Sequence, residues 1–148
     1  MLRPLSRATA EWAAFTSALS EAKLPTEDLG GADQYYFSLE AAAVFGGYFL
    51  AGPDALLRSI VVPARARKLG LGRAMVAALL RQLEGQNVER VWLLTTSASP
   101  FFARLGFSTA ERQSAPSSIA ATPQFLGVCP GSAALMVRFL SPYQETSS

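Results

Sequence analysis

Residues 56–73 combine three features that together suggest an anion-binding site. The apolar run Leu56–Val62 is followed by a basic turn, and Gly70 and Gly72 then open an amphipathic stretch. The first amides of a helix have no acceptor within it, and the helix dipole adds partial positive charge there. Because glycine carries no Cβ, a bulky anion can approach this backbone closely. The pattern therefore predicts a site for a phosphate or pyrophosphate group.

Two common phosphate-binding motifs do not fit this turn. The nucleotide-triphosphate loop ends in Gly-Lys-Ser/Thr, whereas Leu71, Gly72 and Arg73 follow Gly70 here. The dinucleotide fingerprint needs a third glycine at the position that Met75 occupies. A single Gly-x-Gly also occurs in ordinary strand-to-helix connections, so the motif alone leaves that alternative open.

The same segment resembles motif A of the GNAT superfamily of acyl-CoA-dependent N-acyltransferases. That motif reads Arg/Gln-x-x-Gly-x-Gly/Ala, and residues 67–72 read Arg-Lys-Leu-Gly-Leu-Gly. The apolar triplet Ile60–Val62 stands at the family's spacing before the first glycine. A second family block, an aromatic pair followed by Gly-Phe, is similar to residues 101–107. The resemblance covers about residues 1–140.

This resemblance implies an α+β fold, the GNAT fold. Its mixed, mostly antiparallel sheet has about six or seven strands flanked by helices, and its central parallel strands splay apart. The implied cofactor is acetyl-CoA, with its pantetheine arm paired to the backbone of Ile60 and Val62 and its pyrophosphate on the amides of 68–73. The expected cofactor-binding residues are Ile60, Val61, Val62, Arg67, Lys68, Leu69, Gly70, Leu71, Gly72, Arg73, Thr95 and Phe102.

The catalytic groups are not identifiable by the same resemblance. Acyl transfer to an amine needs a polarised thioester, a deprotonated amine and a stabilised thiolate. Many family members have a thiolate-protonating tyrosine at the position of Phe102, and often an asparagine at that of Thr95. Glu27, Asp28 and Glu40 are interpreted as solvated acids. The candidate catalytic side chains are Arg58, Tyr48 and Ser99, with Tyr35 and Tyr36 as further hydroxyls.

Arg58 stands inside the apolar run Leu56–Val62. A buried arginine needs a partner or must face a cavity. One interpretation is that its guanidinium binds a carboxylate of the acceptor bidentately. The other is a structural ion pair with Glu40 or Asp54, and the sequence leaves both open.

A finer resemblance links the chain to a GNAT branch called arsenic-resistance N-acetyltransferases. It rests on residues 56–59, 93–96, 101–107, 121–125 and 129–133. The single cysteine, Cys129, lacks a partner for a trivalent arsenic site, so a buried, inert thiol is the favoured interpretation.

Composition narrows the function classes. The chain has 148 residues, which suits one domain, expected at 1–140, with a polar tail at 141–148. A net charge of +2 is too small for a nucleic-acid footprint. The absence of histidine excludes Ser-His-Asp and Cys-His catalysis, and no metal is expected. The longest apolar stretch, 41–51, is too short to span a bilayer, so we expect a cytoplasmic protein.

Periodicity and turn residues predict the order of the elements. We expect a helix beginning near Thr9, a short second helix capped by Thr26, and a helix capped by Ser99. The strand ending at Val62 and the strand before Thr95 should be parallel neighbours, since a helix crosses between them. The remaining strands are expected at 1–5, 34–39, 43–50, from 107 and at 132–140, with a helical turn within 116–124.

The leading functional hypothesis is an acetyl-CoA-dependent N-acetyltransferase acting on a small, amino-acid-like amine. The alternative is a non-catalytic acyl-CoA-binding module, which the phenylalanine at position 102 and the missing carboxylate favour. The expected partners are the small-molecule amine and a second copy of the chain in a homodimer, with no nucleic acid or membrane.

Overall fold

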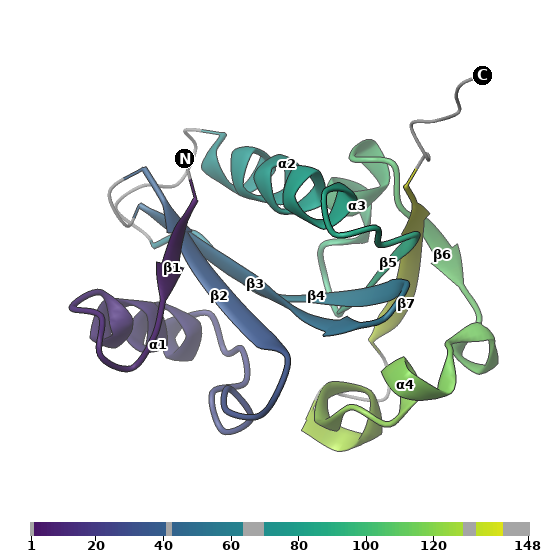
Figure 1. Ribbon diagram of the computed structural model, residues 1–148, viewed down its shortest axis with the longest axis horizontal. Coiled ribbons are helices and arrows are strands. Elements are labelled where there is room, and N and C mark those ends of the chain that lie inside the picture. The colour runs from purple at the N-terminus through teal and green to yellow at the C-terminus, as the bar shows by residue number, and fades with distance from the viewer. Residues whose placement is uncertain (1, 41–42, 64–69, 129–132, 141–148) are drawn as a thin grey trace.

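The computed structural model describes residues 2–40, 43–63, 70–128 and 133–140. They form one seven-stranded sheet in the order β1-β2-β3-β4-β5-β7-β6, with helices on both faces (Figure 1). This architecture confirms the predicted GNAT fold. The elements are β1 (Arg3–Leu5), α1 (Trp12–Glu21), β2 (Gln34–Leu39), β3 (Val44–Ala51), β4 (Asp54–Val61), α2 (Leu71–Glu84), β5 (Arg90–Thr95), α3 (Ser99–Arg104), β6 (Ser108–Ala110), η2 (Arg112–Ser114), α4 (Ser117–Ala120), η3 (Gln124–Val128) and β7 (Ala134–Phe139).

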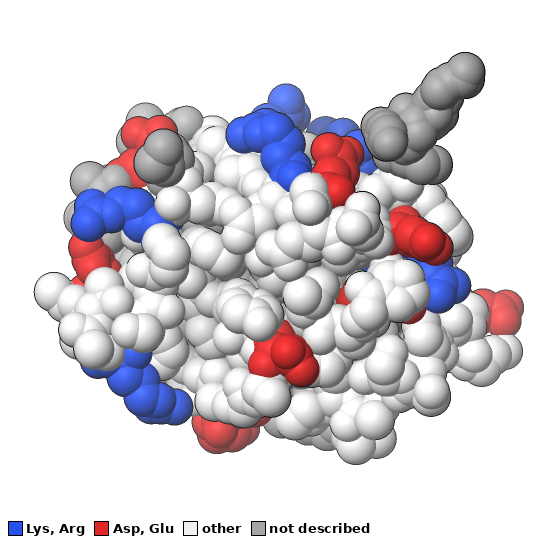
Figure 2. All heavy atoms as spheres, in the orientation of Figure 1, with Lys and Arg blue, Asp and Glu red and all other residues white. Residues whose placement is uncertain are grey.

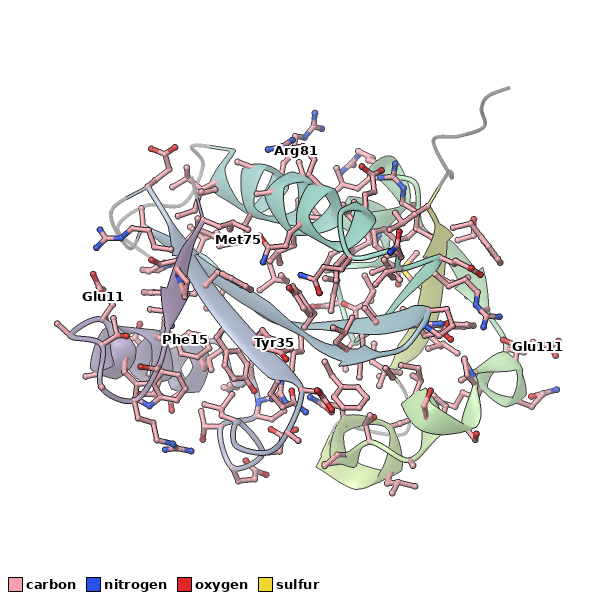
Figure 3. All side chains as sticks on the ribbon, viewed as in Figure 1. Glu11, Phe15, Tyr35, Met75, Arg81 and Glu111 are labelled. Atoms are coloured by element: carbon pink, nitrogen blue, oxygen red, sulfur yellow. The ribbon has the colours of Figure 1, made fainter. Side chains whose placement is uncertain are left out.

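The helix α2 covers one face of the sheet because its apolar side chains recur at helical spacing. Met75 points from α2 toward the sheet, and Arg81 points away from it (Figure 3). Met75 and Leu79 are fully buried among side chains of β3, β4 and β5. This packing holds the N-terminus of α2 in place beside the end of β4.

The opposite face is covered in two places. Phe15 of α1 packs with Tyr36, Phe45 and Val61, whereas Ile119 of α4 packs in a separate cluster with residues of β4, β5 and β7. Figure 1 shows α1 and α4 on the same side of the sheet and apart from each other. The middle of this face, over β4, is therefore bordered by two different helical segments.

The parallel pair β4–β5 is short. Only Asp54–Leu56 pairs with Arg90–Trp92, after which β5 continues in register with β7 alone. A β-bulge lies at the point of separation, because Phe45 opposes Val61 while Gly47 opposes Arg58. Such a bulge bends its strand. The two strands therefore splay, as the family resemblance implied.

The bulge places Ser59 at φ +59°. A serine rarely adopts this conformation, so the surrounding structure must hold it there. Opposite the bulge, a Cβ on Gly46 would lie 2.7 Å from Ile60 Cδ1 and 2.9 Å from Met75 Cγ. The glycine thus lets β3, the bulge and α2 approach one another closely.

Two local predictions were wrong. Residues 24–31 form turns and no helix, because Pro25 and Gly30 bound too short a segment and the Asp28 side chain pairs with Arg58 instead. Ser99 is the first residue of α3, and its cap is Ala98, whose amide donates to Thr95 Oγ1 at 2.9 Å. The predicted tail at 141–148 and Cys129 lie outside the described residues.

The described part of the chain contains no helix that is long and apolar enough to cross a membrane. On the face seen in Figure 2, acidic and basic side chains of the described residues are interspersed, and uncharged side chains cover most of the surface.

Candidate active site

The splayed strands open into a large cleft of about 1260 Å³. Its walls come from both strands after they separate, from the start of α2, from residues 95–98, 101 and 102, and from the loop after α1. Typical ligand pockets enclose roughly 300–1,000 Å³. The cleft is thus large enough for a long, extended ligand, and its floor is the bulged end of β4.

One end of the cleft is the turn at the start of α2. Gly70 caps this helix in the left-handed conformation, at φ +72°, which a residue with a Cβ adopts only with strain. A Cβ placed on Gly70 would meet nothing within 4 Å, so the space beside the turn is open. The first intrahelical bond runs from the Ala74 amide to the Gly70 carbonyl at 3.2 Å. Helical geometry gives the three preceding amides no acceptor within α2.

The predicted cofactor-binding residues converge here. The cleft is lined by Ile60–Val62 at the end of β4, by Gly70–Arg73 at the start of α2, and by Thr95 and Phe102. Phe102 is 8% exposed and packs edge-on against Phe101 and Phe107. The predicted residues Arg67, Lys68 and Leu69 lie outside the described residues. Residues separated by 42 positions along the chain, from 60 to 102, therefore form one continuous wall.

Arg58 lies at the other end, in a network of hydrogen bonds. Its Nη2 contacts Asp28 Oδ1 at 2.7 Å, and both side chains are buried. Its Nη1 donates to the Asp28 carbonyl at 3.1 Å and to Gln34 Oε1 at 3.3 Å, and its Nε donates to Ser59 Oγ at 3.2 Å. The ion-pair partner is thus Asp28 and not Glu40 or Asp54, the partners considered from the sequence.

Asp54 is paired elsewhere. It accepts hydrogen bonds from Arg90 Nη2 at 3.0 Å and from Trp92 Nε1 at 2.9 Å, which ties β4 to β5 where the two strands still pair. Asp54 therefore anchors the closed end of the splayed pair.

Tyr36 packs beside the Arg58 network. Its hydroxyl donates to the Leu29 carbonyl at 2.8 Å, and the Arg58 guanidinium lies 5.6 Å from its ring centre. Burial raises the pKa of Tyr36 to about 12, and the positive charge of Arg58 opposes this rise. The hydroxyl stays protonated at neutral pH and holds the loop after α1.

The other catalytic candidates do not contribute to the cleft wall. Tyr48 is 1% exposed, and its hydroxyl accepts hydrogen bonds from Gln82 and Gln86 at 3.2 and 3.1 Å. Neither Tyr48 nor Ser99 lines the cleft. The carboxylate that does line it, among the described residues, is the exposed Glu27, whose side chain also accepts from the Thr26 amide at 3.3 Å.

The model of the acetyltransferase (GNAT) family matches residues 13–107. The chain therefore belongs to this family. A search of curated proteins finds no match to it.

Solved structures of the same fold are distant in sequence. Tetrahymena GCN5 is 17% identical with a TM-score of 0.74, the alignment covering 97% of this chain and 98% of that one. The ribosomal-protein-S18-alanine N-acetyltransferase from Escherichia coli is 21% identical with a TM-score of 0.69 and 95% coverage of each. N-acetylglutamate synthase from Neisseria gonorrhoeae, complexed with coenzyme A and N-acetyl-glutamate, is 14% identical with a TM-score of 0.73. The match covers 95% of this chain but only 35% of the synthase.

Proposed function

We propose that this chain is an acetyl-CoA-dependent N-acetyltransferase that acts on the amine of a small, amino-acid-like molecule. The observation that carries the proposal is the open glycine turn of α2 at one end of a cleft between two splayed strands. A structural relative, N-acetylglutamate synthase, was solved with coenzyme A and N-acetyl-glutamate, which supports both the cofactor and an amino-acid-like product.

The residues present fit the cofactor. The amides at the start of α2, which have no acceptor within the helix, and the nearby Arg73 suit a pyrophosphate, because both favour negative charge. The apolar wall formed by Ile60, Val62 and Phe101 suits a long, mostly uncharged arm. When bound there, acetyl-CoA supplies an activated thioester carbonyl.

The cleft offers fewer side chains for proton transfer than for binding the cofactor. Phe102 cannot protonate a thiolate, so the leaving group would be stabilised by amides and solvent at the cleft. Glu27 is the lining carboxylate of the described residues and stands exposed at the cleft. We infer that the acceptor amine loses its proton to this carboxylate or to water at the same opening, and that Arg58, engaged with Asp28, shapes the wall.

The test is thiol release from acetyl-CoA across a panel of small amines, with the acetylated product confirmed by mass spectrometry. We expect amine-dependent release with at least one amino-acid-like acceptor. Tight coenzyme A binding with no release for any amine would instead identify a non-catalytic acyl-CoA-binding module. Absence of coenzyme A binding would contradict both functions.

A further inference from the structure

A second, smaller cavity adjoins the cleft at the Arg58 end. It measures about 60 Å³ and is lined by the loop after α1, residues 56–59 in the middle of β4, Leu94 and Gln124. The two spaces share a wall, because several residues line both of them, among them Leu24, Pro25 and Arg58. A water needs roughly 10–15 Å³ of such volume. The cavity thus has room for a small polar group of a few atoms.

Gln124 is the unusual residue of this cavity. It is 4% exposed, and neither its side-chain nitrogen nor its side-chain oxygen has a hydrogen-bond partner among the described residues. A buried amide without partners is costly and is therefore uncommon in proteins. The turn that carries it is held by its own bonds, since Thr122 Oγ1 donates to the Ile119 carbonyl at 2.7 Å and accepts from the Phe125 amide at 3.3 Å. The local backbone therefore does not need the Gln124 side chain.

The charge of the cavity wall is already balanced. The guanidinium of Arg58 is paired with Asp28, and the other lining residues are uncharged. A carboxylate or ammonium group that entered would lose its hydration without gaining a free opposite charge. A neutral amide would lose less, and it carries the donor and acceptor that a glutamine side chain complements.

We propose that Gln124 is a specificity-determining residue that hydrogen-bonds a neutral amide group of the acceptor. The acceptor class is then an amine whose neighbouring carbonyl is a primary amide, as in an amino-acid amide, because only a primary amide presents its C=O and an N–H on the same side. Gln124 Nε2 donates to the acceptor's carbonyl oxygen, and Gln124 Oε1 accepts from its amide N–H. This inference rests on the proposed acetyltransferase function and names its substrate class.

The test compares three probes that share one amine-bearing carbon: L-alaninamide, L-alanine methyl ester and L-alanine. The ester keeps the carbonyl but lacks the N–H, and the free acid carries a carboxylate. We expect kcat/KM for the amide to exceed that for the acid roughly tenfold or more, with the ester between them, since one hydrogen bond typically changes affinity by roughly two- to tenfold.

The variant Gln124→Met keeps the side-chain volume and removes both hydrogen-bonding atoms. We expect it to reduce the amide-to-acid ratio to within about threefold while leaving coenzyme A affinity unchanged. The matched control is Gln113→Met, the same change at an exposed glutamine bonded to Glu111. An unchanged ratio in Gln124→Met, with or without a lower melting temperature, would overturn the proposal and assign the side chain a structural role.

A binding measurement separates this inference from the proposed function. The side-chain NH₂ signals of Gln124 in ¹⁵N-labelled wild-type protein saturated with coenzyme A should shift on adding L-alaninamide and not on adding L-alanine. A shift without turnover would support the recognition role while the acetyltransferase function failed. Turnover without any such shift would overturn the role of Gln124, and this measurement does not depend on a variant that folds.

Discussion

The two ends of the cleft are built in different ways. The α2 end comes from nearby positions of the chain, Ile60–Val62 and Gly70–Arg73, and offers mainly backbone amides and an apolar wall. The Arg58 end draws on residues from four distant segments: the loop at 24–28, β4, Leu94 in β5, and Gln124. The first end offers main-chain amides that have no acceptor within α2, whereas the second holds the Arg58–Asp28 ion pair and, among the described residues, the unpartnered amide of Gln124.

This contrast indicates which part of the site can change its ligand specificity through substitutions. A backbone site depends on chain conformation and tolerates many side chains, provided that glycine stands where φ is positive. A side-chain site depends on which residues the loops happen to bring together. We therefore expect substitutions at the α2 end to act on the cofactor alone, and those at the Arg58 end to act on the acceptor or on stability.

The largest expected effect is at the α2 end. Gly70→Asp places a side chain and a negative charge where the pyrophosphate is proposed to bind. We expect coenzyme A affinity, measured by calorimetry, to fall by roughly a hundredfold or more, because several charge-assisted hydrogen bonds are lost. The matched control is Gly52→Asp in the turn between β3 and β4. Gly52 has φ +61° and equally open surroundings but does not line the cleft.

Similar coenzyme A affinities in the two glycine variants would remove the cofactor from the α2 turn. Such a result would also contradict the assignment of one end of the cleft to the cofactor and the other end to the acceptor.

The next effect is on stability at the Arg58 end. Arg58→Met leaves Asp28 buried without its partner, which typically costs about 3–5 kcal/mol of unfolding free energy. We expect a lower unfolding midpoint in urea and, on folded protein, nearly unchanged coenzyme A affinity. Arg90→Met is the comparison. The Arg90 side chain is 36% exposed, and the buried Asp54 would keep its hydrogen bond from Trp92 Nε1, so this loss should cost less.

If Arg58→Met keeps the free energy of unfolding of the wild type but raises the KM for the acceptor, Arg58 binds the acceptor. The ion pair with Asp28 would then be secondary to recognition.

A smaller effect is expected at Phe102, in the wall of the cleft. Phe102→Tyr introduces the hydroxyl that many relatives of the family carry. If the thiolate needs no acid at this position, kcat should change by less than tenfold, which corresponds to about 1.4 kcal/mol of barrier. A larger gain in steady-state turnover would show that the site lacks a proton donor.

The smallest effect concerns pH. The pKa of Tyr36 is raised to about 12 in the folded chain, against about 10 in the unfolded chain. Its contribution to stability is therefore complete below pH 10 and is lost as the pH rises from 10 to 12. We expect Tyr36→Phe to flatten this part of the stability curve, measured by urea unfolding. An equally steep decline in the variant would assign the loss to other groups.

Most of the fold was predictable because its signals are local. Hydrophobic periodicity and turn residues located each β-strand and the helices α1, α2, α3 and α4 to within a few residues. The exceptions, the helix expected after Pro25 and the Ser99 cap, were short features for which tertiary contacts outweigh local preference. The finer arsenic-resistance resemblance and the homodimer remain predictions.

The proposed cofactor end could be predicted from the sequence, because a glycine-led helix start beside an apolar strand is a local pattern whose chemistry lies in the backbone. Two features could be found from the tertiary structure alone: Asp28 pairs with Arg58, and Gln124, 66 positions after Arg58 in the chain, lines the same small cavity as Arg58. The physical reason is that side-chain pairing across such separations depends on how the α1 loop and η3 pack onto β4, and no local spacing encodes that distance.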